Sequence, residues 1–193
     1  VVWKMKDAIP IFQSNSHGGA IRDITFLEDG TLVSAGDDDI LIVWDLRNNT
    51  HKEIAANHGG VMDVSSIGDV VATAGLDGVV RLWSLPNFEV MEILRGHEDL
   101  IWSVGALKNN RFVSAGKDGS VRWWSADPAI VTTHRATSRM PASDVVFVWN
   151  DLLAVVSEFD SDLQVIDVKE NVHHVIPSNG SELSTVAYIP NTS

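Results

Sequence analysis

GHEDLIWSVGALKNNRFVSAGKDGSVRWW, at residues 96–124, is the fullest copy of a pattern that the chain repeats. Three times, a histidine is followed by a serine or threonine, by an aspartate four residues later and by a tryptophan six residues after that. The three tryptophans lie 39 and 41 residues apart, a period typical of propeller and solenoid arrays. The three sets are His17, Ser34, Asp38 and Trp44; His58, Thr73, Asp77 and Trp83; and His97, Ser114, Asp118 and Trp124.

Each repeat contains short apolar segments separated by turns. Those of the first repeat lie at residues 24–26, 31–36 and 40–44, with turns at 28–30 and 37–39. A fourth segment, such as residues 52–56 or 90–94, precedes the next histidine. The sequence therefore predicts four strands in each repeat.

Several short signatures of the pattern resemble the WD40 repeat family. They are Gly96-His97, the Asp-Gly pairs at 77–78 and 118–119, and Trp44-Asp45. The resemblance covers nearly the whole chain and implies an all-β, WD40-type β-propeller with about four to five blades present. Because rings of this family usually have about seven blades, we expect the chain to be part of a longer one with roughly two more, and to form an open arc.

The resemblance implies a single propeller domain over residues 1–193. We expect a partial blade at 1–12, blades at about 17–56, 58–94, 97–133 and 143–176, and the start of a further blade at 183–189. The fourth repeat is degenerate, with Ile166, Val156 and Arg139 in the tryptophan, hydroxyl and histidine positions. This joint loss is physically reasonable, because replacing all members of a buried polar network can be nearly neutral, whereas deleting one strands the others.

The composition limits the possible functions. With 45% apolar and 21% charged residues, the 193-residue chain resembles an ordinary soluble globular protein, and no apolar run approaches the roughly 20 residues of a membrane helix. The absence of cysteine excludes disulfides and thiol catalysis and favours an intracellular setting, the cytoplasm or nucleus. The net charge of −12 argues against direct nucleic-acid binding, which depends mainly on lysine and arginine.

The resemblance also implies that the four residues of each set form a hydrogen-bonded chain that fixes the loops of one face. We expect these sets to be structural and not catalytic, because a scaffold needs such a set in every repeat and an active site does not. A calcium site at Asp37-Asp38-Asp39 is disfavoured as well. Packed sheets lie about 10 Å apart, so the turn aspartates of different repeats cannot converge on one ion. We expect no catalytic residue, metal, cofactor or small-molecule substrate.

The family's usual partner-binding face is built from residues at the start of each first strand and from the residue before each turn aspartate. The positions that the resemblance assigns to this face are Arg22, Asp37, Met62, Leu76, Leu100, Trp102, Lys117, Asp144 and Phe159. They combine an apolar group with flanking charges, which is the composition expected of a protein-binding surface. The alternative for Trp102 is that it packs into the core.

These observations favour a non-enzymatic scaffold that holds other proteins together within a larger complex. An alternative binding function is that of a substrate receptor in a cullin-RING ubiquitin ligase. It rests on Trp44-Asp45-Leu46-Arg47, which resembles the WDxR adaptor-docking motif and would make Arg47 the contact. A third class is a propeller enzyme such as a hydrolase, but no nucleophile stands beside a base outside the repeated sets.

Overall fold

The structure is a computed structural model, and it describes residues 2–4, 6, 9–107, 109–126, 135–137, 142–149, 152–157, 160–167 and 172–176. Every element of regular secondary structure in these described residues is a β-strand. The strands form one hairpin and four antiparallel sheets of four strands each, which confirms the all-β propeller architecture predicted from the sequence.

Each sheet is built from four consecutive strands. The hairpin consists of β1 (Val2–Lys4) and β2 (Ile9–Phe12). The first sheet contains β3 (Ile21–Phe26), β4 (Leu32–Gly36), β5 (Ile40–Asp45) and β6 (Thr50–Ala55). The second contains β7 (Val61–Ile67), β8 (Val70–Gly75), β9 (Val79–Ser84) and β10 (Glu89–Arg95). The third contains β11 (Ile101–Leu107), β12 (Arg111–Gly116), β13 (Ser120–Ser125) and β14 (Arg135–Thr137). The fourth contains β15 (Ala142–Trp149), β16 (Leu152–Ser157), β17 (Asp160–Asp167) and β18 (Val172–Ile176).

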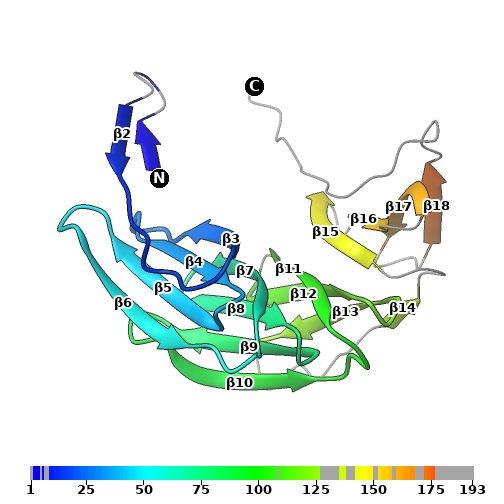
Figure 1. Cartoon of the computed structure of the whole chain (residues 1–193). Helices are drawn as coiled ribbons and strands as arrows, with labels where there is room; N and C mark the ends of the chain where they lie inside the picture. The colour runs from blue at the N-terminus through cyan, green and yellow to red at the C-terminus, as the bar shows by residue number, and fades with distance from the viewer. Residues whose placement is uncertain are drawn as a thin grey trace.

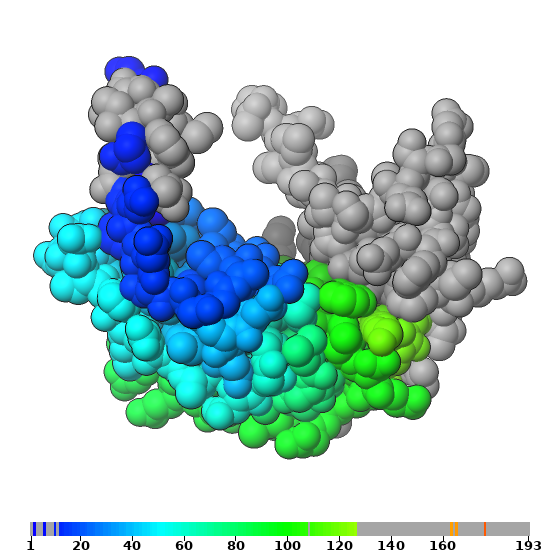
Figure 2. Space-filling view, viewed as in Figure 1, coloured from blue at the N-terminus to red at the C-terminus, as the bar shows by residue number. Residues whose placement is uncertain are grey.

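The sheets stand side by side along an arc, in chain order (Figure 1). The strands β3, β7, β11 and β15 are the inner strands, and β3 contacts β7, β7 contacts β11, and β11 contacts β15. Figure 2 shows the residues between 12 and 126 as one continuous body. Because the sheet faces are used for packing against neighbours, the loops at the strand ends are the surfaces left to vary.

The pairing register repeats from sheet to sheet. Each repeat tryptophan lies opposite an apolar residue of the second strand, as Trp83 lies opposite Val71, and Ile166 lies opposite Leu153 in the fourth sheet. Two residues before the tryptophan on the third strand, Arg81 pairs with Thr73, the hydroxyl residue of the second repeat. The equivalent residue of the fourth sheet is Gln164, and it pairs with Val155. A register shift between Val155 and Ser157 therefore moves the hydroxyl position from the expected Val156 to Val155.

The turn between the second and third strands has the same conformation in three sheets. Asp39, Gly78 and Gly119 have φ angles of 62°, 69° and 70°. Glycine adopts this left-handed conformation without steric cost, and aspartate tolerates it better than most residues. A Cβ atom on Gly78 would also lie 2.7 Å from the carbonyl oxygen of Asp99. The turn thus fixes the aspartate that precedes it in each repeat.

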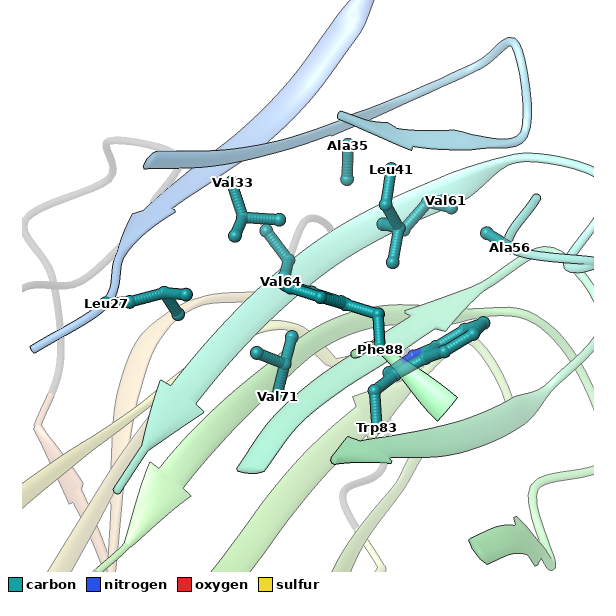
Figure 3. Packing of buried hydrophobic residues seen from close by; sticks show 10 residues of the cluster. All are labelled: Leu27, Val33, Ala35, Leu41, Ala56, Val61, Val64, Val71, Trp83 and Phe88. Carbon is teal, nitrogen blue, oxygen red and sulfur yellow. The ribbon is translucent and has the colours of Figure 1, made fainter. Parts of the chain in front are cut away.

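Apolar clusters join neighbouring sheets. Leu41 of the first sheet and Val71 and Trp83 of the second belong to one cluster, shown in Figure 3, and each is at most 2% exposed. A corresponding cluster that contains Leu82 and Trp124 joins the second and third sheets. Each of these tryptophan rings therefore packs against the preceding sheet.

The first sheet is covered differently. The ring of Trp44 packs on Phe12 of the hairpin, with centroids 5.3 Å apart and the rings edge to face. Ile21, Ile24 and Phe26 of the inner strand β3 remain 55%, 53% and 56% exposed among the described residues. The hairpin thus packs against the two middle strands of this sheet, β4 and β5, and leaves its inner strand open.

Candidate functional site

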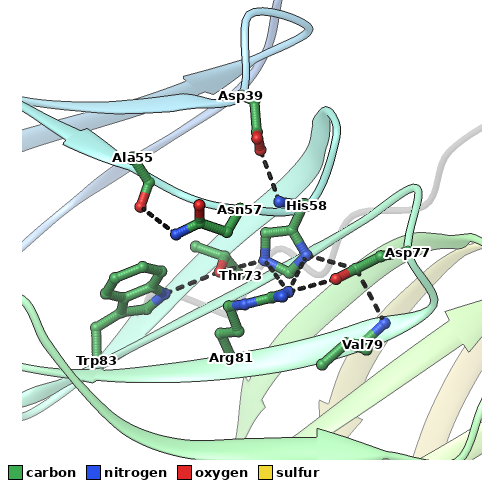
Figure 4. Close-up of polar contacts among 9 residues, drawn as sticks. All are labelled: Asp39, Ala55, Asn57, His58, Thr73, Asp77, Val79, Arg81 and Trp83. Atoms are coloured by element: carbon green, nitrogen blue, oxygen red, sulfur yellow. Dashed lines mark hydrogen bonds and ion pairs between the residues drawn. The ribbon is translucent and has the colours of Figure 1, made fainter.

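The second repeat shows how the four repeated residues are connected (Figure 4). His58 Nδ1 lies 2.7 Å from Asp77 Oδ1, and His58 Nε2 lies 2.9 Å from Thr73 Oγ1. The indole N–H of Trp83 donates to the same hydroxyl oxygen at 2.9 Å. Since a carboxylate only accepts, the contact with Asp77 assigns the histidine proton to Nδ1, which Arg81 Nη1 also approaches to 2.8 Å, and Nε2 then accepts from the threonine hydroxyl. The chain of donors runs from tryptophan through hydroxyl and histidine to aspartate.

The structure brings the other two sets together in the same way. In the first repeat, Ser34 Oγ lies 2.7 Å from His17 Nε2 and 2.8 Å from Trp44 Nε1, and His17 Nδ1 lies 2.8 Å from Asp38. In the third repeat, Ser114 Oγ lies 2.7 Å from both His97 Nε2 and Trp124 Nε1. His97 Nδ1 lies 3.0 Å from Asp118 Oδ1.

These sets contain the residue types of a hydrolase triad, but their geometry blocks that chemistry. Ser34, Thr73 and Ser114 are at most 2% exposed. Each hydroxyl already accepts from an indole and is within hydrogen-bond distance of a histidine, so no substrate carbonyl can approach it. In each set, the contact between histidine and aspartate joins the loop before the first strand to the turn after the second strand.

Electrostatics keep the aspartates of the sets ionised. Burial alone raises the pKa of Asp77, but hydrogen bonds from His58 and Arg81 outweigh it, so the pKa is lowered overall. Burial lowers the pKa of His58, which Asp77 opposes and the Arg81 charge reinforces. Arg81 Nη1 lies 2.6 Å from Asp77 Oδ2. Sequence reasoning missed Arg81, whose only signal was its place opposite Thr73 on the neighbouring strand.

Thr73→Val should lower the free energy of unfolding by about 2 kcal/mol, because it leaves the Trp83 N–H and His58 Nε2 buried without their common partner. Thr73→Ser keeps the hydroxyl and should cost less than about 1 kcal/mol. Urea unfolding curves of both variants and of the unchanged chain measure the difference. Equal stability of Thr73→Val and Thr73→Ser would contradict a role for the hydroxyl.

The residues assigned to the partner-binding face lie on a repeated frame. In the inner strands the register shifts between Ile21 and Asp23, between Val61 and Asp63 and between Ile101 and Ser103. The bulge residues are therefore Arg22, Met62 and Trp102, and such bulges re-aim side chains. In β15 the shift lies between Ala142 and Asp144, which makes Ser143 the equivalent residue in place of Asp144.

A backbone hydrogen bond ties the turn to each bulge. The N–H groups of Asp37, Leu76 and Lys117 donate to the carbonyls of Ala20, Gly60 and Leu100, two residues before the respective bulge, at 2.9–3.1 Å. The structure thus matches each bulge residue with one turn residue on the same frame: Arg22 with Asp37, Met62 with Leu76, and Trp102 with Lys117.

The three pairs differ in chemistry. Arg22 forms two 2.6 Å hydrogen bonds with Asp37. Leu76 is 47% exposed, and Met62, Leu100 and Trp102 are half-buried, so Trp102 belongs neither wholly to the core nor to the solvent. Lys117 Nζ lies 3.7 Å from Asp99 Oδ2. The Asp144 side chain and the whole of Phe159 lie outside the described residues.

Two inner-strand aspartates that sequence reasoning missed join neighbouring sheets. Asp23 Oδ2 accepts from the Val64 N–H at 3.2 Å, and Asp63 Oδ2 accepts from the Val104 N–H at 2.7 Å. Burial, followed by the nearby Asp23, raises the pKa of Asp63 well above its usual value. The signal in the sequence was the recurrence of aspartate 40 residues apart.

Arg47 lies in the exposed turn after β5, at the opposite strand ends from the bulge residues. Its backbone N–H donates to Asp45 Oδ1 at 3.0 Å. It lines a hollow of about 200 Å³ together with Asp29 and Asp45. Two carboxylates therefore line the same hollow as the arginine on which the adaptor-docking interpretation depends.

Neither a metal site nor a membrane helix is found in the part of the chain that the structure describes. No group of three or more histidine, aspartate or glutamate side chains there is placed to hold an ion. No helix among those residues is long and apolar enough to cross a bilayer.

Comparison with known proteins agrees with the repeat architecture. The family model described as WD domain, G-beta repeat matches residues 9–45, 50–84 and 88–125. Ribosome biogenesis protein YTM1 of Kluyveromyces lactis is 29% identical in an alignment of 149 residues, which covers 70% of this chain and 32% of that protein. The WDR12 homolog of Chlamydomonas reinhardtii is also described as a ribosome biogenesis protein. It is 32% identical in an alignment of 109 residues, which covers 49% of this chain and 24% of that protein.

A relative from a different process is similar to the same extent. The pre-mRNA-splicing factor cwf17 of Schizosaccharomyces pombe is 29% identical over 105 residues, 52% of this chain and 31% of the relative. The chain thus spans about a third or less of the length of these relatives.

Proposed function

Because this chain belongs to the WD40-repeat family, we propose that it is a non-enzymatic scaffold that binds a protein partner on its loop face. We define the loop face as the three bulge-and-turn pairs together with Leu100. The observation that carries the proposal is the repeated backbone frame, in which the N–H groups of Asp37, Leu76 and Lys117 each bond to the strand two residues before a bulge. One rigid frame that presents different side chains in each repeat is suited to recognition, because little ordering entropy is lost on binding.

The chemistry of the face supports a protein partner. Met62, Leu76 and Trp102 supply apolar surface on neighbouring sheets, and the ion pairs of Arg22 and Lys117 flank it. Aromatic and methionine side chains with a charged rim are enriched at protein interfaces. The net charge of −12 opposes contact with a phosphate backbone.

The relatives support membership of a larger assembly within the cell. Two are described as ribosome biogenesis proteins and one as a pre-mRNA-splicing factor. None of these three carries a ubiquitin-ligase name, so a ligase-adaptor role for Arg47 is not proposed. An intracellular location in the cytoplasm or nucleus fits the same descriptions.

A variant with both Met62→Ala and Trp102→Ala should retain its stoichiometric partner at a level at least about tenfold lower in quantitative affinity purification. The reason is that central apolar residues dominate interface energies. The matched control is Val90→Ala with Met91→Ala. These side chains are 46% and 49% exposed on the outer strand β10, away from the loop face. Retention of every partner by the first variant, at unchanged thermal stability, would contradict the proposed face.

A further inference from the structure

A cavity of about 280 Å³ opens between the first two sheets, at the strand ends opposite the loop face. We call it the lower pocket. Its first wall is the β3–β4 loop with Leu27, Glu28 and Asp29, together with Val43 of β5. The second wall is the β7–β8 turn with Asp69 and the β9–β10 loop; the residues there are Gly68, Asp69, Leu85, Pro86 and Phe88.

The lower pocket exists because one turn at this interface is short and one side chain that faces it is small. The β7–β8 connection consists of Gly68 and Asp69 alone, with Gly68 in the left-handed region at φ 53°. Val43 also stands where the register of the second and third sheets places Leu82 and Trp123. Those residues are 0% and 6% exposed and occupy more volume than valine. The first interface therefore keeps a space that a larger side chain would fill.

The lining combines an apolar floor with an acidic rim. Leu27 and Phe88 are at most 9% exposed, and Val43 is half-buried. Glu28, Asp29 and Asp69 are exposed at the mouth, and none of the described residues that line the cavity is basic. The Asp29 carboxylate accepts from the Thr31 N–H at 2.8 Å, and this bond lowers its pKa. The mouth is therefore anionic at neutral pH, above a surface suited to methylene groups.

We infer that the lower pocket binds an arginine side chain of a partner polypeptide. The aliphatic stem would lie on Val43 and Leu85, and the guanidinium would meet the carboxylates of the rim. Arginine suits this arrangement because it combines an apolar stem with a weakly hydrated, forked cation that pairs with carboxylates. The volume is just below the roughly 300 Å³ at which small-molecule sites begin, which favours a single side chain over a cofactor.

The test uses N-acetyl-arginine methylamide as the probe, with the full chain labelled on its methyl groups. Titration followed by NMR should give saturable shifts concentrated on Leu27, Val43 and Leu85. The corresponding citrulline, norleucine and lysine derivatives separate charge, apolar length and the forked cation. We expect the arginine derivative to bind at least about fivefold more tightly than each of the others, and its affinity to fall as salt rises.

Two variants decide whether the lower pocket is the site. Val43→Leu introduces the larger side chain that the second sheet has at this position, in Leu82. It should weaken probe binding at least about fivefold without lowering the unfolding midpoint. Glu28→Gln with Asp69→Asn should weaken it by a similar factor, whereas Glu89→Gln with Glu92→Gln on β10 should leave it unchanged. Equal binding by the unchanged chain and either pocket variant would overturn the inference, as would equal binding of the citrulline, norleucine or lysine derivative. The loop-face variants do not touch this site, so the two proposals fail independently.

Discussion

Replacing Trp83 with alanine should lower the free energy of unfolding by about 3–5 kcal/mol, the range expected for removing a buried aromatic side chain. Trp83 is 2% exposed and lies in the cluster that joins the first two sheets. Its removal leaves a cavity between them and also takes away the N–H that donates to Thr73. Urea or thermal unfolding of the variant beside the unchanged chain measures the loss.

Trp83→Phe is the matched control, because it keeps most of the apolar volume and removes only the indole N–H. It should cost about 1–2 kcal/mol, since Thr73 retains its contact with His58. If alanine and phenylalanine destabilised the chain equally, the cluster would not depend on the volume of this ring.

Asp118→Ala should cost about 3 kcal/mol at pH 7, because several buried donors lose one acceptor. Asp118 accepts from the Glu98 and Ser120 N–H groups, at 3.0 and 2.9 Å, and from the Ser120 hydroxyl at 2.7 Å. Its side chain is 4% exposed, and that of His97 is 0% exposed. Their mutual contact closes the third set.

The same aspartate makes stability depend on pH. Burial raises the pKa of Asp118, but the hydrogen bonds from Glu98, Ser120 and His97 lower it overall to about 2, from the usual value of 3.8. A pKa that is lower in the folded state contributes stability above the unfolded-state value, and this contribution is lost as pH falls through the folded value. Asp118 should therefore contribute about 2 kcal/mol near neutral pH that disappears between about pH 4 and pH 2.

Urea unfolding of the unchanged chain and of Asp118→Ala at a series of pH values tests this linkage. The stability difference between them should shrink by about 2 kcal/mol as the pH falls from about 5 to about 2. Asp29→Ala is a useful control, because that carboxylate is exposed and its loss should change stability little. A difference for Asp118 that stays constant over this range would show that its ionisation is not linked to folding.

The fold was predictable because the repeat places residues with distinct physical roles at fixed spacing. Trp83 needs a buried apolar face and one acceptor, and Gly78 provides the left-handed turn that follows Asp77. Such requirements leave few alternatives, so the order of residue types was enough to predict four strands in each repeat. The fourth repeat was harder, because a single-residue bulge at Val156 cannot be recognised in a run of apolar residues.

Features that depend on contacts between repeats were not predictable from the sequence alone. Asp63 looks like any polar residue near the start of a strand until Val104 is placed beside it. The lower pocket depends on the volume of Val43 relative to Leu82, and this comparison requires the register of two different sheets. In both cases the information lies in residues about 40 positions apart, whose packing no local pattern describes.

The bonds of Asp23 and Asp63 also have a direction that matters during synthesis of the chain on the ribosome. In each bond the acceptor lies in the repeat that is made first, and the donor lies in the repeat made next. At translation rates of about 5–20 residues per second, a repeat of this length follows its predecessor by several seconds. Each emerging unit therefore meets a neighbour that already carries its docking acceptor, which allows assembly from the N-terminus onward, one unit at a time.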